Sequence, residues 1–202
     1  MSTSQYYSDN AEEFYKSTVN ADMSATYDRF LKYIPHGSKI LDFGCGSGRD
    51  SKAFIGMGYL VEAVDGSEEL CRLASELLGM EVKCMDFKEL NKLSEYNAIW
   101  ACASLLHIPS IELPQLLEKM KDSIDGNGVM YISFKHGDYE GWRNGRFFVD
   151  MTSEGFSKIL SKVDGVYLLE EWYSEDVRNE NNTKWYNVIV GKGKTNGFFS
   201  KC

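Results

Sequence analysis

The sequence predicts an α/β protein with a mostly parallel sheet and an antiparallel hairpin at one edge. Short apolar runs alternate with amphipathic stretches along most of the chain, the pattern that gives parallel strands joined by right-handed crossovers. The last two apolar runs have no helical stretch between them. We therefore expect these two runs to pair antiparallel.

The expected strands cover 39–43, 59–64, 81–85, 98–102, 129–134, 166–172 and 185–190. The expected helices cover 49–55, 68–78, 111–123 and 152–162, each with apolar residues at helical spacing. Ser67 is a suitable N-cap for the second of these helices. We expect a turn at 125–128 and a polar loop at 174–183.

Composition indicates one ordinary globular domain over residues 1–202. The chain has 22 Lys plus Arg against 30 Asp plus Glu, a formal net charge of −8 and 43% hydrophobic residues. We expect an N-terminal helical arm at 1–33, a core at 34–193 and a flexible tail at 194–202. The acidic balance disfavours nucleic acid and anionic membranes as partners.

Several features predict a cytoplasmic protein. The polar run after Met1 has no signal-peptide pattern, and no apolar stretch approaches the length of a membrane span. The cysteines are odd in number and form no CxxC pair, which fits a reducing compartment and no structural zinc. They are Cys45, Cys71, Cys84, Cys102 and Cys202.

The most informative segment is the Gly-rich turn at 44–48, between the first strand and the first core helix. Glycines there let a ligand approach the backbone, and the helix that follows offers free N–H donors. Arg49 stands where a dinucleotide-binding fingerprint has its third glycine. Asp42 precedes the turn and suits a ligand with an ammonium group rather than a pyrophosphate.

Two further acids follow the next two strands. Asp65 can accept both hydroxyls of a ribose, and Asp86 can accept a hydrogen bond from an adenine amino group between Met85 and Phe87. Together the three acids indicate an adenosine that carries an amino acid. The simpler interpretations are a plain tight turn, salt-bridged or capping acids, an Asp86 that only caps residues 87–90, and a solvated Arg49.

These motifs resemble the class I S-adenosylmethionine-dependent methyltransferases over residues 34–191. ILDFGCGSG resembles the family's first motif, AVDGS its ribose-binding acid, MDF its adenine-binding acid and ASLLH the segment after strand four. More narrowly, GCGSGRDS, ASLLHIP and SFKHGDYEG resemble small bacterial methyltransferases near the tellurite-resistance group. Asn97 departs from the family at a position that is usually a structural Asp.

The resemblance implies a Rossmann-like seven-stranded sheet of order 3-2-1-4-5-7-6, with strand 7 antiparallel and helices on both faces. It implies a methyltransferase (EC 2.1.1.-) that uses S-adenosyl-L-methionine and releases S-adenosyl-L-homocysteine. The implied cofactor-binding residues are Tyr15, Asp42, Gly44, Cys45, Gly46, Ser47, Gly48, Arg49, Asp65, Gly66, Ser67, Met85, Asp86, Phe87, Ala101, Cys102 and Leu106.

His107 is the expected catalytic residue, because it follows strand four at the edge of the sheet where ligands bind. It is a candidate general base, with a substrate contact or a loop-holding role as alternatives. The aromatic arm is expected either to close over the site as a lid or only to pack on the sheet. The expected acceptor contacts are Tyr7, Lys135, Trp142, Arg146, Arg178 and Trp185.

A small-molecule acceptor, with an O, N, S or metalloid oxyanion as the receiving group, is the favoured substrate. The chain has only three prolines and lacks the [DNS]PP[YFW] and Pro-Cys motifs of DNA methyltransferases. The expectation is a monomer or homodimer that binds no metal. The alternatives are a non-catalytic binding module, a nucleic-acid or protein methyltransferase, and an NAD-dependent oxidoreductase.

Overall fold

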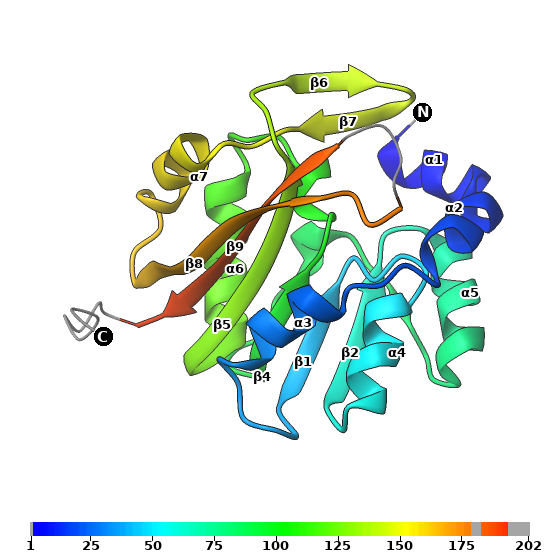
Figure 1. Ribbon diagram of the computed structural model, residues 1–202, viewed down its shortest axis with the longest axis horizontal. Coiled ribbons are helices and arrows are strands. Elements are labelled where there is room, and N and C mark those ends of the chain that lie inside the picture. The colour runs from blue at the N-terminus through cyan, green and yellow to red at the C-terminus, as the bar shows by residue number, and fades with distance from the viewer. Residues whose placement is uncertain (1, 179–182, 194–202) are drawn as a thin grey trace.

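The computed structural model describes residues 2–178 and 183–193, and its centre is a seven-stranded sheet (Figure 1). The strands are β1 (Lys39–Phe43), β2 (Leu60–Asp65), β3 (Lys83–Cys84), β4 (Tyr96–Ala101), β5 (Ile124–Lys135), β8 (Val166–Glu175) and β9 (Lys184–Lys192). Their order is β3-β2-β1-β4-β5-β9-β8, with β9 antiparallel to both neighbours. The predicted order 3-2-1-4-5-7-6 is confirmed.

Helices cover both faces of this sheet. Among the core helices, α4 (Arg49–Gly56), α5 (Glu68–Leu78), α6 (Leu113–Ser123) and α7 (Ser153–Leu160) lie within or close to the expected ranges. Side chains alternate between the two faces of a strand, so Ile40 contributes to the cluster under α4, and Leu41 to the cluster under α6 and α7. Each face therefore has its own apolar layer.

The N-terminal segment does not form one separate unit. Three helices, α1 (Thr3–Asp9), α2 (Ala11–Thr18) and α3 (Ser24–Leu31), occupy it. In α3, Tyr27 and Phe30 are buried against Trp100 of β4 and Phe54 of α4. α3 therefore belongs to the core, and only α1 and α2 lie at the upper edge of the sheet as an arm (Figure 1).

Two local expectations are wrong. The residues expected as a turn at 125–128 lie inside β5, where an irregularity in the register with β4 absorbs them. The side chain of Asn97 stabilises this junction by accepting from the Lys39 N–H at 2.7 Å and donating to Asp125 at 2.7 Å. The asparagine at this position, where the family usually has Asp, thus has a structural role.

The second difference is a hairpin in a region, between residues 135 and 151, where the sequence analysis expected neither a strand nor a helix. β6 (Glu140–Arg143) and β7 (Arg146–Val149) pair antiparallel around a tight turn, apart from the main sheet. Asn144 in the turn has φ +50° and Gly145 has φ +76°, values that suit Asn and Gly. The hairpin lies across the top of the molecule, beside α1 (Figure 1).

No helix within the described residues is long and apolar enough to cross a bilayer. Nor do the described His, Cys, Asp and Glu side chains form a group of three or more suited to a metal ion. The expected tail at 194–202, which includes Cys202, lies outside the described residues.

Candidate active site

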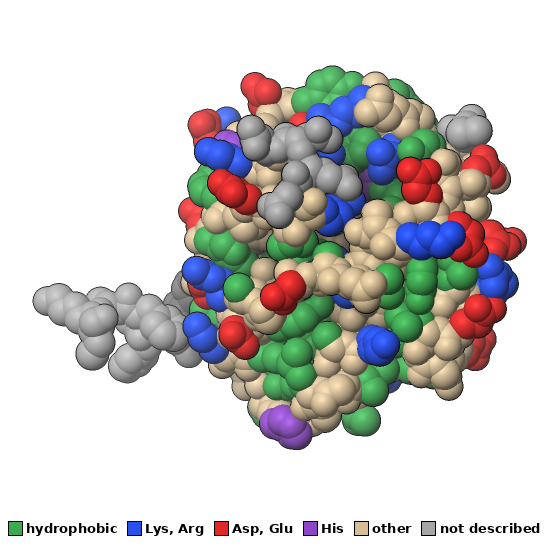
Figure 2. All heavy atoms as spheres, turned by 45° about the vertical axis from the view of Figure 1, so that its right-hand side comes forward, with side chains coloured by type: hydrophobic (Ala, Val, Ile, Leu, Met, Phe, Trp, Pro, Cys, Tyr) green, Lys and Arg blue, Asp and Glu red, His purple; other side chains and the backbone are tan. Residues whose placement is uncertain are grey.

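A cavity of about 1370 Å³ lies at the carboxyl ends of the parallel strands, the edge where open α/β sheets bind ligands. It brings together most of the residues that the sequence analysis selected. Figure 2 shows the molecular surface with the side of α1, α2 and α5 turned forward. The predicted residues in its wall are Tyr7, Gly44, Cys45, Gly46, Ser47, Arg49, Asp65, Gly66, Ser67, Met85, Asp86, Phe87, Cys102, Leu106, His107, Lys135, Trp142, Arg146, Arg178 and Trp185.

The Gly-rich turn packs closely against the segment after β4. Gly44 has φ +88°, and a Cβ added to it would lie 2.4 Å from Cβ of Ser104. Gly46 has φ +55°, and its added Cβ would lie 3.0 Å from the ring of Phe14. Glycine is therefore required at position 44 by the close contact with Ser104, and at position 46 by the close contact with Phe14 of the N-terminal arm.

Asp65 connects the end of β2 to this turn. Its carboxylate accepts the N–H of Gly46 at 2.8 Å and the N–H of Ser67 at 2.9 Å. Burial raises the pKa of Asp65, and these backbone donors oppose the rise. Each carboxylate oxygen keeps one further lone pair for a ligand, which fits the ribose contact expected of this residue.

Asp86 both lines the cavity and caps a short 3-10 helix, Phe87–Glu89. Its side chain accepts the Lys88 N–H at 2.8 Å, and Glu89 accepts the Asp86 N–H at 2.8 Å. The capping interpretation is thus correct for this residue, and it is compatible with a ligand contact. Phe87 packs on Phe43 with ring centroids 4.6 Å apart.

Asp50 is a cavity residue that the sequence analysis missed. The side chains of Tyr27 and Trp100 donate to it at 2.5 and 2.8 Å, and Arg49 forms a two-point ion pair at 2.6 and 2.9 Å. Burial alone would raise the pKa of Asp50, but Arg49 and the other donors hold it below its usual range. The sequence feature that could have identified Asp50 is its position in the first turn of the helix after the glycine turn.

Four predicted cofactor contacts do not line the cavity. Asp42 faces α4, where it accepts from the Ser51 hydroxyl at 2.6 Å, and burial next to Asp50 raises its pKa to about 8. Tyr15 packs on the Leu70 and Leu73 cluster instead. Gly48 lies against Ala74 and Ala101 is fully buried in the core, so neither reaches the cavity.

The arm lies over the cavity and connects its two sides. Ser8 and Ser67 form a hydroxyl hydrogen bond of 2.9 Å, and Thr3 accepts the N–H of Phe147 at 3.1 Å. α1 thereby contacts the loop after β2 and the β6–β7 hairpin at once. The rings of Tyr7 and Phe14 pack edge to face beneath it, 5.1 Å apart.

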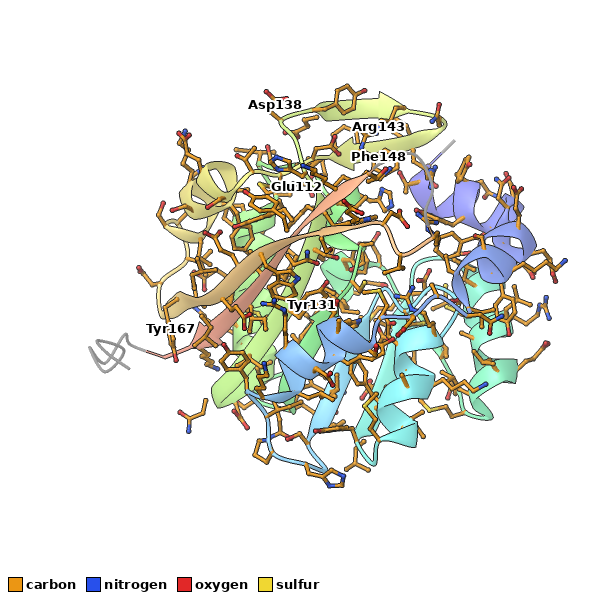
Figure 3. All side chains as sticks on the ribbon, in the orientation of Figure 1. Glu112, Tyr131, Asp138, Arg143, Phe148 and Tyr167 are labelled. Carbon is orange, nitrogen blue, oxygen red and sulfur yellow. The ribbon has the colours of Figure 1, made fainter. Side chains whose placement is uncertain are left out.

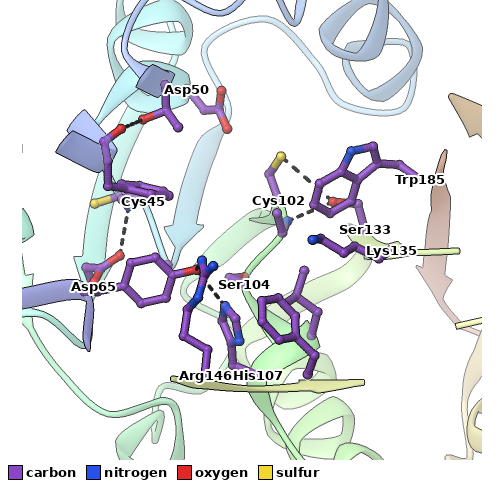
Figure 4. Close-up of a pocket in the computed structure, with 18 of the residues that line it drawn as sticks. Cys45, Asp50, Asp65, Cys102, Ser104, His107, Ser133, Lys135, Arg146 and Trp185 are labelled. Carbon is purple, nitrogen blue, oxygen red and sulfur yellow. Dashed lines mark hydrogen bonds between the residues drawn. The ribbon is translucent and has the colours of Figure 1, made fainter. Parts of the chain in front are cut away.

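His107, in the short 3-10 helix Leu105–His107, is held by two hydrogen bonds (Figure 4). Its Nδ1 lies 2.7 Å from the carbonyl of Phe147, which can only accept, so Nδ1 carries the proton. Nε2 therefore accepts from the Tyr7 hydroxyl at 2.9 Å. Burial and three nearby cations lower the pKa of His107 to about 4, so it is neutral at pH 7.

The other side of the cavity is aromatic and basic. Trp185 comes from β9, Trp142 from β6 and Lys135 from the end of β5. Arg178 pairs with Asp176 at 2.8 Å. These positions are separated in sequence by up to 50 residues, and only the packing of two hairpins beside β5 brings them together.

Comparison with known proteins finds a family match for the central part of the chain. Residues 40–128 match the family model described as a methyltransferase domain. The matched segment makes up less than half of the 202 residues. The match includes the glycine turn, Asp65, Asp86 and His107, and its description agrees with the expected enzyme class, an S-adenosylmethionine-dependent methyltransferase. No curated protein sequence matches the chain.

Several solved structures share this fold. An S-adenosylmethionine-dependent methyltransferase from Methanosarcina mazei has a TM-score of 0.72 at 17% identity, covering 82% of this chain and 97% of that one. A Burkholderia thailandensis 1,6-didemethyltoxoflavin-N1-methyltransferase with bound S-adenosylhomocysteine also scores 0.72 at 17%, covering 96% and 92%. Magnesium protoporphyrin IX methyltransferase from Synechocystis PCC 6803 with bound S-adenosylhomocysteine scores 0.73 at 15%, covering 94% and 97%.

These structures confirm the methyltransferase fold and include the cofactor product that we expected. The similarity to the tellurite-resistance group has no support among them and stays a prediction.

Proposed function

We propose that this protein transfers a methyl group from S-adenosylmethionine to a small molecule. One observation supports this most directly: the glycine turn, Asp65 and Asp86 share a single cavity with the aromatic and basic wall beyond them. A cofactor held at the first group would present its methyl toward an acceptor held at the second.

The residues present fit the cofactor. Gly44 and Gly46 of the turn line the cavity with backbone alone, and the carboxylate of Asp65 keeps lone pairs for the two ribose hydroxyls. Asp86 with Met85 and Phe87 forms an edge suited to adenine. When bound, S-adenosylmethionine supplies an electrophilic methyl group on a sulfonium centre.

Methyl transfer is an in-line displacement, so the protein contributes mainly position and exclusion of water. In the proposed domain division, α1 and α2 act as the lid, and 34–193 together with α3 forms the core. The hydrogen bonds of α1 to Ser67 and Phe147 hold this lid closed. The faces of Tyr7 and Phe14 would favour a nearby sulfonium.

We propose that His107 positions the lid rather than removing a proton in the closed state. Its only basic nitrogen already accepts from Tyr7, and its low pKa makes it a weak base. Acceptors that need no deprotonation by the protein therefore fit best. A small acceptor also fits a cavity that is covered by α1 and a hairpin.

Calorimetric titration of the purified protein with S-adenosylmethionine, S-adenosylhomocysteine and NAD tests the cofactor. We expect binding of both sulfur nucleosides and none of NAD. At ligand about 100-fold above its Kd, the midpoint of thermal unfolding should rise by an amount that corresponds to about 2.7 kcal/mol. Binding of NAD alone would favour the oxidoreductase alternative and contradict the proposal.

Asp65→Asn should lower the affinity for S-adenosylhomocysteine by at least tenfold, about 1.4 kcal/mol or more, because ionised acceptors make the stronger hydrogen bonds. Asparagine has nearly the same shape as aspartate, and its side-chain oxygen can still accept one of the two backbone N–H groups that bond to Asp65. Glu81→Gln, on the loop before β3, is the matched control and should bind normally. Equal affinity in both variants would remove Asp65 from the site, and tight binding without turnover of any acceptor would favour the non-catalytic module.

A further inference from the structure

The basic side chains around the acceptor side of the cavity fall into two groups. Arg143 forms a two-point ion pair with Asp150 at 2.7 and 2.5 Å, and Arg178 pairs with Asp176. Lys135 and Arg146 form no ion pair with any acid in residues 2–178 or 183–193. Two positive charges in the cavity wall are therefore not neutralised by these parts of the chain.

Lys135 is half-buried at the end of β5, with its Nζ 5.0 Å from the ring centroid of Phe148. It makes no side-chain hydrogen bond within the described chain. Burial and the repulsion of Arg143 and Arg146 lower its pKa. In Figure 4 its amino group points into the open part of the cavity, away from the strand.

Arg146 reaches the same cavity from β7. Its guanidinium lies 5.1 Å from the Phe148 centroid and 4.6 Å from that of Tyr6, and one nitrogen donates to the Tyr7 hydroxyl at 3.2 Å. Its Nε is buried without a partner. Lys135 and Arg146 thus share one aromatic neighbour and face one space; Figure 3 shows Phe148 and Arg143 near the hairpin.

A second observation also indicates a missing ligand group. Ser104 is 5% exposed, lines the cavity, and its hydroxyl has no hydrogen-bond partner in the described chain. Buried hydroxyls are rarely left unpaired. Figure 4 shows Ser104 between Lys135 and Arg146 in the cavity floor. A polar ligand at this place would satisfy it.

The acids near this space are already engaged. Asp50 is committed to Arg49, Asp65 to backbone N–H groups and Asp176 to Arg178. Glu112 pairs with Lys88, and Glu175 is exposed at the end of β8. Asp86 accepts the N–H of Lys88, Asp22 accepts the N–H of Ser24, and Asp150 is committed to Arg143. Within the described residues the charge around Lys135 and Arg146 is therefore net positive. These cations add to burial, the main cause, in lowering the pKa of His107.

We infer that the methyl acceptor carries an oxyanion group, a carboxylate or a phosphate, which binds between Lys135 and Arg146. The inference rests on the proposed function, since it identifies the acceptor of that site. Guanidinium and ammonium groups that are partly desolvated and unpaired bind such anions strongly. The anion would also hold Arg146 against Tyr7 and so favour the closed lid.

The test is calorimetric titration with benzoate and with inorganic phosphate as probes, each with and without saturating S-adenosylhomocysteine. Benzamide serves as the neutral analogue of benzoate. We expect at least one anion to bind and benzamide to bind at least tenfold more weakly than benzoate. Tighter benzoate points to a carboxylate acceptor, and tighter phosphate to a phosphorylated one.

The variants Lys135→Met and Arg146→Met should each weaken anion binding by at least tenfold, while Lys135→Arg retains it. Lys158→Met, at an exposed lysine of α7, is the control and should bind the anion normally. The affinity for S-adenosylhomocysteine should be the same in all four variants. Failure of the wild-type protein to bind S-adenosylhomocysteine would overturn the proposed cofactor. Anion binding is also measured in the absence of S-adenosylhomocysteine, so it tests the inference separately.

Anion binding that is absent, or unchanged within twofold in Lys135→Met and Arg146→Met, would overturn the inference. Circular dichroism of each variant separates this outcome from misfolding. Because Lys135→Arg retains the charge, a loss of binding in Lys135→Met with retention in Lys135→Arg cannot result from a general packing defect.

Discussion

The two sides of the cavity are built in different ways. The cofactor side consists of three short segments that directly follow consecutive strands, 44–48, 65–67 and 85–87, and its polar groups bond mainly to backbone. The acceptor side is assembled from side chains as distant as Tyr7, His107 and Arg146. The first side is held by hydrogen bonds to the backbone of neighbouring loops, whereas the second depends on how the lid and two hairpins pack together.

This difference predicts where substitutions act. On the cofactor side, damage should affect both the stability of the fold and the affinity for the nucleoside. On the acceptor side, damage should affect lid closure and acceptor binding, and the sheet should remain intact.

The largest effect is expected for Gly44→Ala. The added Cβ would collide with Ser104 at 2.4 Å in a backbone with φ +88°, so we expect a loss of about 2–5 kcal/mol in the free energy of unfolding. Urea unfolding measures it. Gly79→Ala is the matched control, since its φ is +64° but its Cβ meets nothing within 4 Å.

The control should lose only about 1–2 kcal/mol, the conformational cost of a left-handed residue. Equal losses in the two variants would show that the contact beneath the glycine turn contributes nothing.

The next effect is the pH dependence that comes from His107. Its pKa is lowered from 6.5 to about 4, so the unfolded chain binds this proton more readily. The resulting stability is full above pH 6.5 and is lost as the pH falls from 6.5 to 4, up to about 3 kcal/mol.

Urea unfolding of wild type and His107→Gln between pH 4 and 7 checks this, and the variant should show a smaller slope. Asp42, whose raised pKa acts in the opposite direction, is common to both proteins and cancels in the difference. Parallel curves would contradict the buried neutral His107.

The smallest effect is expected for Tyr7→Phe, which removes the hydroxyl between His107 and Arg146. Losing these two hydrogen bonds should cost about 1–2 kcal/mol. Amide exchange in α1 should then accelerate on the order of tenfold, while that of the sheet stays unchanged. Tyr6→Phe is the control, because its hydroxyl forms no hydrogen bond with residues 2–178 or 183–193. Similar exchange in both variants would mean that Tyr7 does not hold the lid.

The sequence predicted correctly those features that depend on residues close together in the chain. Short-range patterns were enough to predict the strand order and to place the glycine turn, Asp65 and Asp86 at strand ends that line the cavity. Their contacts with a cofactor stay a prediction. Prediction from sequence failed for Asp42, because the alternation of side chains along β1 turns that carboxylate toward α4. It also missed the β6–β7 hairpin, whose signal is a short Asn-Gly turn between brief apolar runs.

By itself the sequence determined the class and strand order of the sheet and the edge at which the cavity lies. These follow from periodicity and from backbone requirements at single positions. Only the tertiary structure decided that α3 belongs to the core, that Tyr7 occupies the basic nitrogen of His107, and that Lys135 and Arg146 are left without acids within the described chain. Such arrangements depend on contacts between segments distant in the sequence, such as Tyr7 and His107 at a separation of 100 residues, which no local pattern encodes.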